Sequence, residues 1–320
     1  MELLKETLKN IENKFGKEVF FSQEKIKKEN IIPSGSLMLD DILGIGGFPK
    51  GRIIEIYGNE SCGKTTIALQ TIAQCQQKNE GKIAYIDFEH ALDASYCQKL
   101  NVDIKRMLVI HPLNEEQGFD IINALIKANA VDMIVIDSVA AMVPKAEMEG
   151  DFGDQTIGLH ARNMSKGLRI MQTLMNDDSP CIIFINQLRE KVGVMYGNPE
   201  TTTGGKALKF YSSIRIELRR KEILKNGNSI VGIKTNAKIV KNKLAPALRE
   251  TTIDIFYDKG FDYQNEVFEY ALEKGIIEKR GSWMYIENER IGQGKESIKK
   301  YFDENEEKYK DLIKKVIKEN

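Results

Sequence analysis

Residues 53–66 read IIEIYGNESCGKTT, an apolar run that leads through a glycine-bounded loop into the start of an amphipathic helix. The segment from Gly58 to Thr65 fits the pattern G-x-x-x-x-G-K-[ST] in the strand–loop–helix context that this pattern requires. The glycines let backbone N–H groups surround phosphate oxygens, and the helix N-terminus adds partial positive charge. The stretch therefore predicts a phosphate-binding loop for ATP, with Lys64 on the β- and γ-phosphates and Thr65 on Mg²⁺.

Three further polar residues stand at the carboxyl ends of apolar runs, where open α/β sheets bind ligands. Asp137 ends the run MIVID and is placed to hold Mg²⁺ through water. Glu89 follows IAYIDF and could accept a proton from an attacking water, and Gln187 follows IIFIN and could sense the γ-phosphate. Each alone could be a strand-capping polar residue. Together with the phosphate-binding loop, they predict one site along one edge of one sheet.

The chain around these motifs alternates strand-like runs with amphipathic helices, which favours an α/β fold with a mainly parallel sheet covered on both faces. The expected strands are Ile53–Tyr57, Ile83–Phe88, Met107–Ile110, Met133–Asp137 and Cys181–Asn186. The expected helices between them are Thr65–Gln76, Glu116–Ala128 and Leu159–Met175. Three later runs alternate apolar and polar residues, as antiparallel strands at the far edge of a sheet do: Ser213–Arg219, Ile230–Lys241 and Thr251–Tyr257.

The composition is that of an ordinary soluble protein, with 42% hydrophobic and 29% charged residues among 320. The longest apolar runs, such as Met133–Ile136, are too short to cross a bilayer, and the N-terminal sequence lacks the apolar core of a signal peptide. No two of the four cysteines have C-x-x-C spacing, which argues against a metal site or a disulfide framework. We therefore expect a cytoplasmic protein with no membrane partner.

Formal charge is balanced over the whole chain, with 47 basic and 47 acidic residues, but it is uneven along it. Between Thr201 and Glu250 there are twelve Lys or Arg and only three acidic residues. A local basic excess of this size inside a neutral protein is typical of a surface that binds nucleic-acid phosphates. Charge alone leaves the alternative of a solvated basic face with no ligand.

The two ends of the chain differ from its middle. Near the N-terminus an apolar stripe at helical spacing must be buried on its own core or on a neighbour; it consists of Leu4, Leu8, Ile11 and Phe15. From about residue 263 the composition shifts to Glu and Lys, and the tail reads as helical with one small strand pair near Ser282–Ile291. We expect three parts, which are residues 1–32, 33–262 and 263–320.

Six segments appear in the order that is typical of one protein family. They are GRIIEIYGNESCGKTT, DFEHALD, VIDSVAA, FINQLREKVGVMYGNPETTTGGKALKFY, KIVKNKLAP and IGQGK. With them the chain resembles the bacterial RecA recombinase family from about Phe15 to Gly294. The resemblance implies a RecA-like P-loop ATPase core in a DNA-dependent ATPase that forms a filament on single-stranded DNA. It also implies pairing and strand exchange with double-stranded DNA in recombinational repair, and promotion of SOS repressor self-cleavage.

The resemblance further implies roles for individual residues. The catalytic set would be Glu89, Lys64, Gln187, Lys241 and Lys243, the last two acting on the γ-phosphate of a neighbouring subunit. The nucleotide set would be Gly58, Asn59, Glu60, Ser61, Cys62, Gly63, Lys64, Thr65, Thr66, Asp93 and Tyr96, with Thr65 and Asp137 at the metal. DNA would contact a first loop (Glu149–Thr156), a second loop (Leu188–Lys206), and Arg162, Arg169, Arg189, Gly204, Gly205 and Lys206. Phe210 and the N-terminal polymerisation helix would lie in the subunit interface.

Some positions depart from the family pattern. Asn59 and Cys62 stand where proline and serine are usual, which the loop tolerates because its backbone N–H groups bind the phosphates. Phe88 replaces a small residue beside Glu89, so the packing there needs an explanation. Lys206 stands where many members have asparagine or arginine. The sequence also ends without the acidic tail of many relatives, which predicts less restrained binding of duplex DNA.

Two other classes of function stay open. A ring-forming helicase or other RecA-like motor would share the ATPase site, but the loop at 193–205 and the KNK segment argue against it. A nucleotide-gated scaffold would need to bind ATP but not to hydrolyse it, and it would have no need of Glu89 as a water-activating carboxylate. For Lys241 and Lys243 the alternative is contact with DNA phosphates or solvent.

Overall fold

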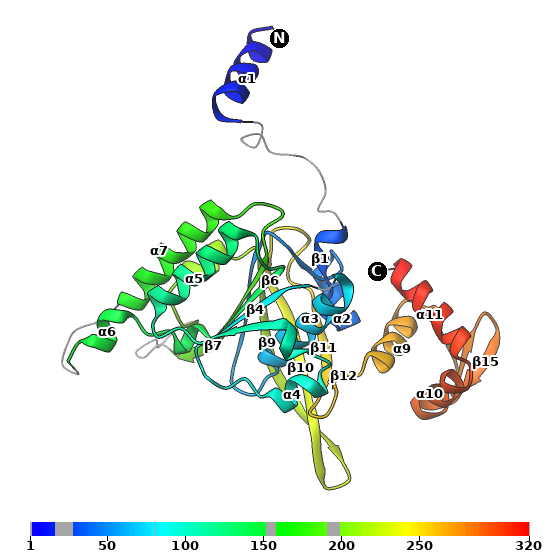
Figure 1. The fold of residues 1–320 in the computed structure, drawn as a ribbon. Coiled ribbons are helices and arrows are strands. Elements are labelled where there is room, and N and C mark those ends of the chain that lie inside the picture. The colour runs from blue at the N-terminus through cyan, green and yellow to red at the C-terminus, as the bar shows by residue number, and fades with distance from the viewer. Residues whose placement is uncertain (1, 17–27, 80, 152–157, 191–198, 320) are drawn as a thin grey trace.

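The computed structural model describes residues 2–16, 28–79, 81–151, 158–190 and 199–319. Its centre is a ten-stranded sheet of order β12-β11-β10-β9-β3-β7-β6-β4-β5, with β8 (Glu200–Thr202) paired to the end of β7. The helices cover both faces of this sheet (Figure 1). This architecture confirms the predicted α/β fold.

The parallel part of the sheet carries the motifs found in the sequence. It consists of β3 (Ile53–Gly58), β7 (Cys181–Glu190), β6 (Met133–Asp137), β4 (Ile83–Asp87) and β5 (Met107–Ile110). Strands β3, β4 and β6 are buried along their whole length, as expected for apolar runs covered on both faces. Their carboxyl ends lie at one edge, because these neighbouring strands all pair in parallel.

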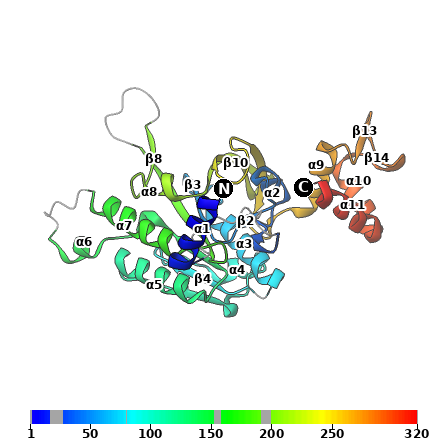
Figure 2. The ribbon, with the colours of Figure 1, turned by 90° about the horizontal axis from the view of Figure 1, so that it is seen from above.

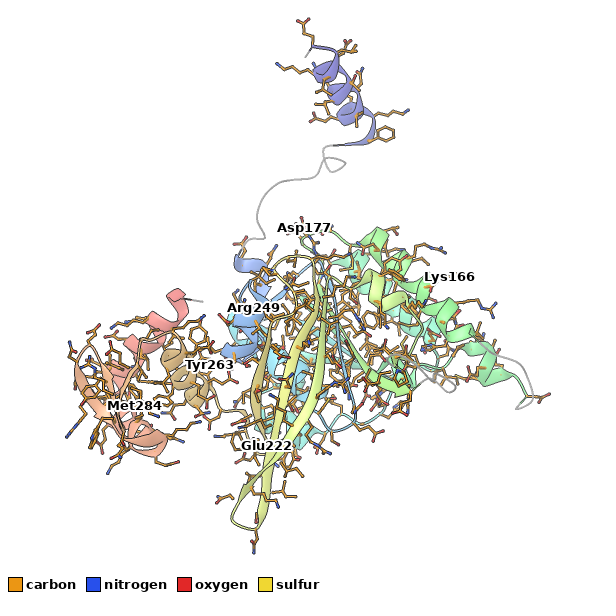
Figure 3. All side chains as sticks on the ribbon, turned by 180° about the vertical axis from the view of Figure 1, so that it is seen from behind. Lys166, Asp177, Glu222, Arg249, Tyr263 and Met284 are labelled. Carbon is orange, nitrogen blue, oxygen red and sulfur yellow. The ribbon has the colours of Figure 1, made fainter. Side chains whose placement is uncertain are left out.

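The rest of the sheet is mainly antiparallel, as predicted. Strand β9 (Ile214–Asn226) runs parallel to β3, and β10 (Ser229–Asn242), β11 (Glu250–Phe256) and β12 (Gly260–Phe261) follow it in antiparallel order. The β9–β10 hairpin extends beyond the body of the molecule, with Glu222 on its outer part (Figure 3). Its turn uses Gly227 in the left-handed region, with φ of 59°.

Alternate side chains of the strands enter two separate cores. Ile54 and Ile56 pack in one core with residues of α2 (Leu37–Leu43), α3 (Lys64–Asn79) and α4 (Ala94–Lys99). Ile53 packs in the other with α5 (Glu115–Ala128), α7 (Leu159–Leu174) and α8 (Ala207–Tyr211). Figure 2 shows α5 and α7 side by side on their face of the sheet. The short elements are β1 (Ile31–Ile32), β2 (Phe48–Pro49), α6 (Lys145–Glu149) and 3-10 turns at Lys28–Asn30, Ile104–Arg106 and Val139–Ala141.

A small C-terminal unit has its own core beside α2 (Figure 1). It contains α9 (Tyr263–Glu273), β13 (Glu278–Arg280), β14 (Trp283–Ile286), β15 (Glu289–Gly292), α10 (Gly294–Glu304) and α11 (Glu306–Glu319). Met284 lies inside this unit and Tyr263 at its junction with the larger core (Figure 3). The predicted strand pair near Ser282–Ile291 is present as β14 and β15. The structure adds a third strand, β13, which is exposed at every position and shows no apolar alternation.

Helix α1 (Glu2–Phe15) stands apart from the sheet (Figure 1). None of its residues is buried, and Leu3, Leu4 and Phe15 are 79%, 63% and 56% exposed. The apolar stripe therefore does not pack on its own core in this structure. Among the described residues, no helix is long and apolar enough to span a membrane.

Candidate nucleotide site and DNA-binding surface

The phosphate-binding loop joins the end of β3 to the start of α3. Two of its glycines are required by close packing, since a Cβ at Gly58 would overlap the Leu218 carbonyl and one at Gly63 would overlap the Ile255 side chain. Gly63 has φ of 93° and Ser61 has φ of 54°, so the loop turns through left-handed conformations before the helix begins. Packing against β9 and β11, together with these dihedral angles, thus fixes a curved backbone, and the first N–H groups of α3 point along the helix axis.

The ammonium group of Lys64 lies inside the curve of this loop. Its Nζ donates to the carbonyls of Asn59 at 2.7 Å and Gly58 at 3.2 Å. The side chain is buried, so these carbonyls replace the solvent that a charged group would otherwise have. Lys64 is therefore held inside the loop by the loop's own backbone carbonyls.

Asp137 is the acceptor of two hydroxyl groups. Its Oδ2 accepts from Thr65 Oγ1 at 2.9 Å and from Tyr85 Oη at 2.7 Å. Burial raises the pKa of the carboxyl to about 6, and both hydroxyl bonds oppose that rise. Thr65 and Asp137, far apart in sequence, thus share one oxygen-rich point at the carboxyl edge of the sheet.

Glu89 lies between the end of β6 and Gln187, which stands inside β7 and not after it, level with Gly58 at the end of β3. Its Oε1 accepts from Ser138 Oγ and, at 3.2 Å, from Gln187 Nε2. Ser138 follows Asp137 directly, so the three predicted strand-end residues do gather at one place. Ser138 was not predicted as a site residue, although it directly follows the carboxylate that ends β6.

The packing of Phe88 beside Glu89 has a clear cause. The ring is buried against Gly118 of α5, where a Cβ would overlap Cζ and lie 3.2 and 3.4 Å from Cε2 and Cε1. Gly118 leaves room for the large side chain that replaces a small one. The departure at Phe88 is therefore accommodated by a second residue, thirty positions along the chain.

The residues predicted beside the adenine form a small cluster near the start of α3. Asp93 caps α4 by accepting from Ser95 N at 2.7 Å and Tyr96 N at 3.3 Å. The Tyr96 hydroxyl lies 2.8 Å from Thr66 Oγ1, and burial raises the pKa of this phenol. Asp93 thus orients the helix that presents Tyr96 next to the phosphate-binding loop.

Lys241 and Lys243 lie away from this site. Lys241 of β10 pairs with Arg215 of β9, and Arg215 pairs in turn with Glu55 of β3. Glu55 stands three residues before Gly58, and β10 then runs away from the phosphate-binding loop. Lys241 Nζ donates to the carbonyls of Lys209 at 2.6 Å and Phe210 at 3.0 Å, while Lys243 is exposed. Burial, Lys243 and Arg215 lower the pKa of Lys241.

The DNA-binding candidates that the structure describes lie on or beside α7. Arg162, Arg169, Arg189 and Lys206 are exposed, and Gly204 and Gly205 have φ of 80° and 77°. Most of the first loop (152–156) and much of the second (191–198) lie outside the described residues. Glu149–Asp151, Leu188–Glu190 and Pro199–Lys206 are described.

The basic stretch between 201 and 250 is less positive than its composition predicts. Arg215 pairs with buried Glu55 at 2.5 Å, and Arg219 contacts both Glu200 and Glu217. Lys234 also pairs with Glu222 at 3.1 Å and with Asp254 at 3.7 Å. The count of charges between 201 and 250 could not include three of these partners, because Glu55, Glu200 and Asp254 lie outside that segment.

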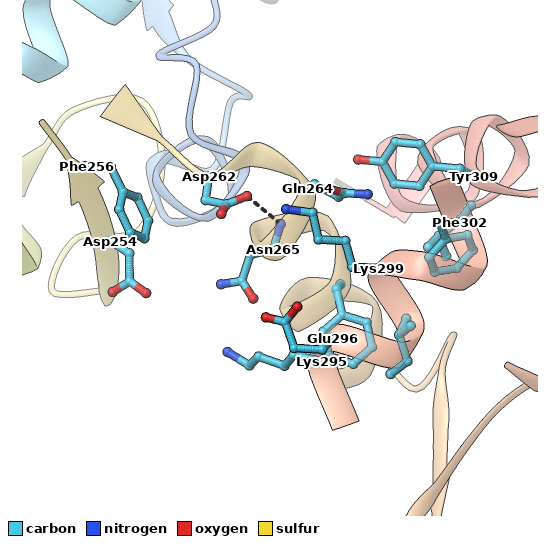
Figure 4. A pocket seen from close by; sticks show the side chains of 13 residues that line it. Asp254, Phe256, Asp262, Gln264, Asn265, Lys295, Glu296, Lys299, Phe302 and Tyr309 are labelled. Atoms are coloured by element: carbon cyan, nitrogen blue, oxygen red, sulfur yellow. Dashed lines mark hydrogen bonds between the residues drawn. The ribbon is translucent and has the colours of Figure 1, made fainter. Parts of the chain in front are cut away.

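A separate pocket of about 220 Å³ lies between β11 and the C-terminal helices (Figure 4). Its described lining mixes the acids Asp254 and Asp262 with Lys295 and Lys299 and does not include the phosphate-binding loop. The mixed charges give it no preference for an anion such as phosphate. The nucleotide site is therefore defined by the strand ends and not by this pocket.

Comparison with known proteins agrees with the geometry. Residues 2–262 match the RecA N-terminal domain and residues 265–320 match the RecA C-terminal domain. The chain is 50% identical to protein RecA of Malacoplasma penetrans over 97% of this chain and 93% of the relative. It is 52% identical to protein RecA of Bacillus subtilis over 94% of this chain and 86% of the relative. The chain therefore belongs to the RecA family, and it is an ATP-binding, DNA-dependent ATPase that forms filaments on single-stranded DNA and exchanges strands in recombinational repair and the SOS response.

Proposed function

We propose that ATP hydrolysis takes place at the strand ends around Glu89, with the phosphates held by residues 58–66. The observation that supports this most directly is that one carboxylate oxygen of Glu89 contacts both Ser138 and Gln187. Glu89 would accept the proton of the attacking water, and Lys64 would leave its loop carbonyls for the β- and γ-phosphates. Asp93 and Tyr96 would border the adenine.

Mg²⁺ fits the donor set of this site. Thr65 Oγ1 and Asp137 Oδ2 are hard oxygen donors at the same point, and Mg²⁺ favours few protein oxygens together with water and phosphate oxygens. When bound, the ion would neutralise charge on the β- and γ-phosphates. The Thr65–Asp137 hydrogen bond keeps both oxygens in place for it.

Gln187 would couple this chemistry to DNA binding. Its amide reaches Glu89, while its strand β7 continues into the proposed second DNA-binding loop. Asn186 also donates to Glu55 at 3.0 Å and to the Thr203 carbonyl at 3.1 Å, which joins both ends of that loop to the sheet. A shift of Gln187 toward the γ-phosphate would therefore move the root of the loop and free Glu89 for water.

The Glu89→Gln variant tests this assignment. The amide keeps the shape of the side chain but cannot act as a base, so we expect ATP and DNA binding near the normal level and hydrolysis lowered by about 10²-fold or more. Fluorescent-nucleotide binding and phosphate release would be measured with and without single-stranded DNA. Loss of ATP binding, with hydrolysis and binding falling together, would show that Glu89 is structural instead.

We propose that Lys241 and Lys243 act on the ATP of a neighbouring subunit. Their register places them about 10 Å back along the sheet from the phosphate-binding loop of their own chain, which supports action in trans. Hydrolysis would then need assembly, and DNA would switch it on by nucleating a filament. Phe210, 70% exposed beside Lys241, would lie in the same interface.

A mixing experiment tests action in trans. A Lys64→Ala protein should not hydrolyse ATP at its own site. A Lys241→Ala/Lys243→Ala protein keeps its phosphate-binding loop intact. Mixed filaments should recover part of the DNA-stimulated hydrolysis that neither protein shows alone. Absence of recovery despite co-assembly would mean that the lysines do not work across the interface.

We also propose single- and double-stranded DNA as ligands of both loops, together with Arg162, Arg169, Arg189 and Lys206. The exposed stripe of α1 would dock on an adjacent subunit. Residues 1–32 would therefore serve filament assembly, residues 33–262 would carry catalysis and DNA binding, and residues 263–320 would form a C-terminal domain. The SOS repressor would be a further partner, in the cytoplasm.

A further inference from the structure

The first turn of α5 touches both flanks of the proposed first DNA-binding loop. Glu116 Oε2 accepts from the backbone N–H of Lys145, the first residue of α6, at 2.8 Å. Its other oxygen, Oε1, accepts from Asn163 Nδ2 of α7 at 2.8 Å. Helix α6 leads into the loop and α7 follows it, so one carboxylate joins the two sides (Figures 1 and 2).

Glu115 adds a buried contact to the same turn. The carboxylate has no exposed surface, and its Oε2 accepts from Asn163 Nδ2 at 3.4 Å. His160 Nδ1 lies 3.1 Å from Oε1. Burial raises the pKa of the Glu115 carboxyl, while His160 and Asn163 lower it.

The far side of His160 meets the return of the proposed second loop. A Cβ built on Gly204 would lie 3.1 Å from the side chains of Met164 and Val139 and 3.4 Å from His160 Nε2, and one on Gly205 would lie 2.9 Å from Ala161 Cβ. Both glycines have positive φ, so the chain turns tightly onto the first turn of α7. His160 therefore stands between Glu115 and the second loop.

Two adjacent carboxylates are an unusual choice beside a surface that binds phosphates. Exposed Arg162 lies one residue from Ala161 on the same turn of α7, so the acids reduce the positive potential at that turn. We propose that Glu115 and Glu116 are positioning residues that clamp the flanks of the first loop and, through His160, hold the return of the second. This inference rests on the proposed contact of these loops with DNA.

The Glu116→Gln variant separates positioning from simple electrostatics. A glutamine has one acceptor oxygen, and if that oxygen keeps the Lys145 contact, its NH₂ group faces the Nδ2 donor of Asn163. Both contacts survive only if the Asn163 amide flips, which removes its bond to Glu115. Removing a negative charge near DNA predicts tighter binding, whereas loss of the clamp predicts affinity for single-stranded DNA weaker by about three- to tenfold. Oligo(dT) binding would be followed by fluorescence anisotropy with a slowly hydrolysed ATP analogue, at several salt concentrations. The salt slope should stay constant, because no phosphate contact is removed.

Three further variants decide between the outcomes. Glu147→Gln removes an equal charge from the exposed face of α6 and should leave affinity unchanged or slightly higher. Asn163→Ala keeps both acids but removes their common donor, and it should weaken binding as Glu116→Gln does. ATP-analogue affinity and the thermal midpoint should change little in both.

Normal or tighter DNA binding by Glu116→Gln and Asn163→Ala would overturn the clamp. If Arg169→Ala, a proposed DNA contact, still lost affinity in that case, the DNA-binding loops would stand and the clamp alone would fail. Normal binding by Arg169→Ala as well would refute the DNA surface itself.

Discussion

The contact between Phe88 and Gly118 makes a quantitative prediction about the core beside the catalytic glutamate. In an exposed helix, Gly→Ala stabilises by about 1 kcal/mol because alanine has the higher helix propensity. At Gly118 the added methyl would overlap Phe88 Cζ, and overpacking of a core costs about 1–3 kcal/mol. We therefore expect Gly118→Ala to lower the free energy of unfolding by up to about 2 kcal/mol.

The sign should reverse when the ring is absent. Phe88→Ala alone should cost about 3–5 kcal/mol, since it leaves a cavity against α5. In that background Gly118→Ala fills part of the cavity and regains helix propensity, so it should stabilise by about 1 kcal/mol. The two changes should thus couple by about 1–3 kcal/mol.

Urea unfolding followed by circular dichroism at 222 nm is the appropriate assay. The single tryptophan, Trp283, lies in the C-terminal unit, and its fluorescence would report on that unit rather than on α5. Additive effects of the two substitutions would refute the explanation that Gly118 accommodates Phe88. A stabilising Gly118→Ala in the unaltered protein would refute it equally.

Two other predictions concern buried polar groups. Burial raises the pKa of Glu266 from 4.5 to about 8. Between these two pH values the folded state still holds a proton that the unfolded state has released, so the free energy of unfolding should fall by a few kcal/mol as pH rises from 4.5 to about 8. Glu266→Gln should flatten this pH dependence in urea titrations and the exposed control Glu273→Gln should not; an unchanged slope in Glu266→Gln would contradict the assignment. Tyr85→Phe removes a donor to Asp137 and should destabilise by about 1–3 kcal/mol while raising the Mg²⁺ concentration needed to bind a fluorescent ATP analogue; equal Mg²⁺ dependence in both proteins would mean that the phenol only fills space.

Much of the fold could be predicted from local pattern. The runs that became β3, β4 and β6 begin where the alternation of apolar segments and helices placed them, because a strand buried on both faces needs an unbroken apolar run. Strand β5 also begins where it was expected, although it is an edge strand in which only Met107 is buried. The polar residues that follow these strands could also be predicted to lie together, because neighbouring parallel strands end at the same edge of the sheet. The exposed strand β13 could not be found this way, because neither of its faces is apolar.

What the sequence could not predict is the pairing of side chains that only strand order and helix packing bring together. Tyr85 meets Asp137 because β4 and β6 are neighbours, with Tyr85 opposite Val135 and Asp87 opposite Asp137. Glu115 meets His160 because α5 and α7 pack on the same face, and neither residue shows a functional pattern of its own. Such contacts depend on register between segments, and a shift by one residue would send each strand side chain to the other face. The phosphate-binding motif is a continuous stretch of sequence and can therefore be recognised from the sequence. The residues that hold it in place come from separate segments and can be identified only in the folded chain.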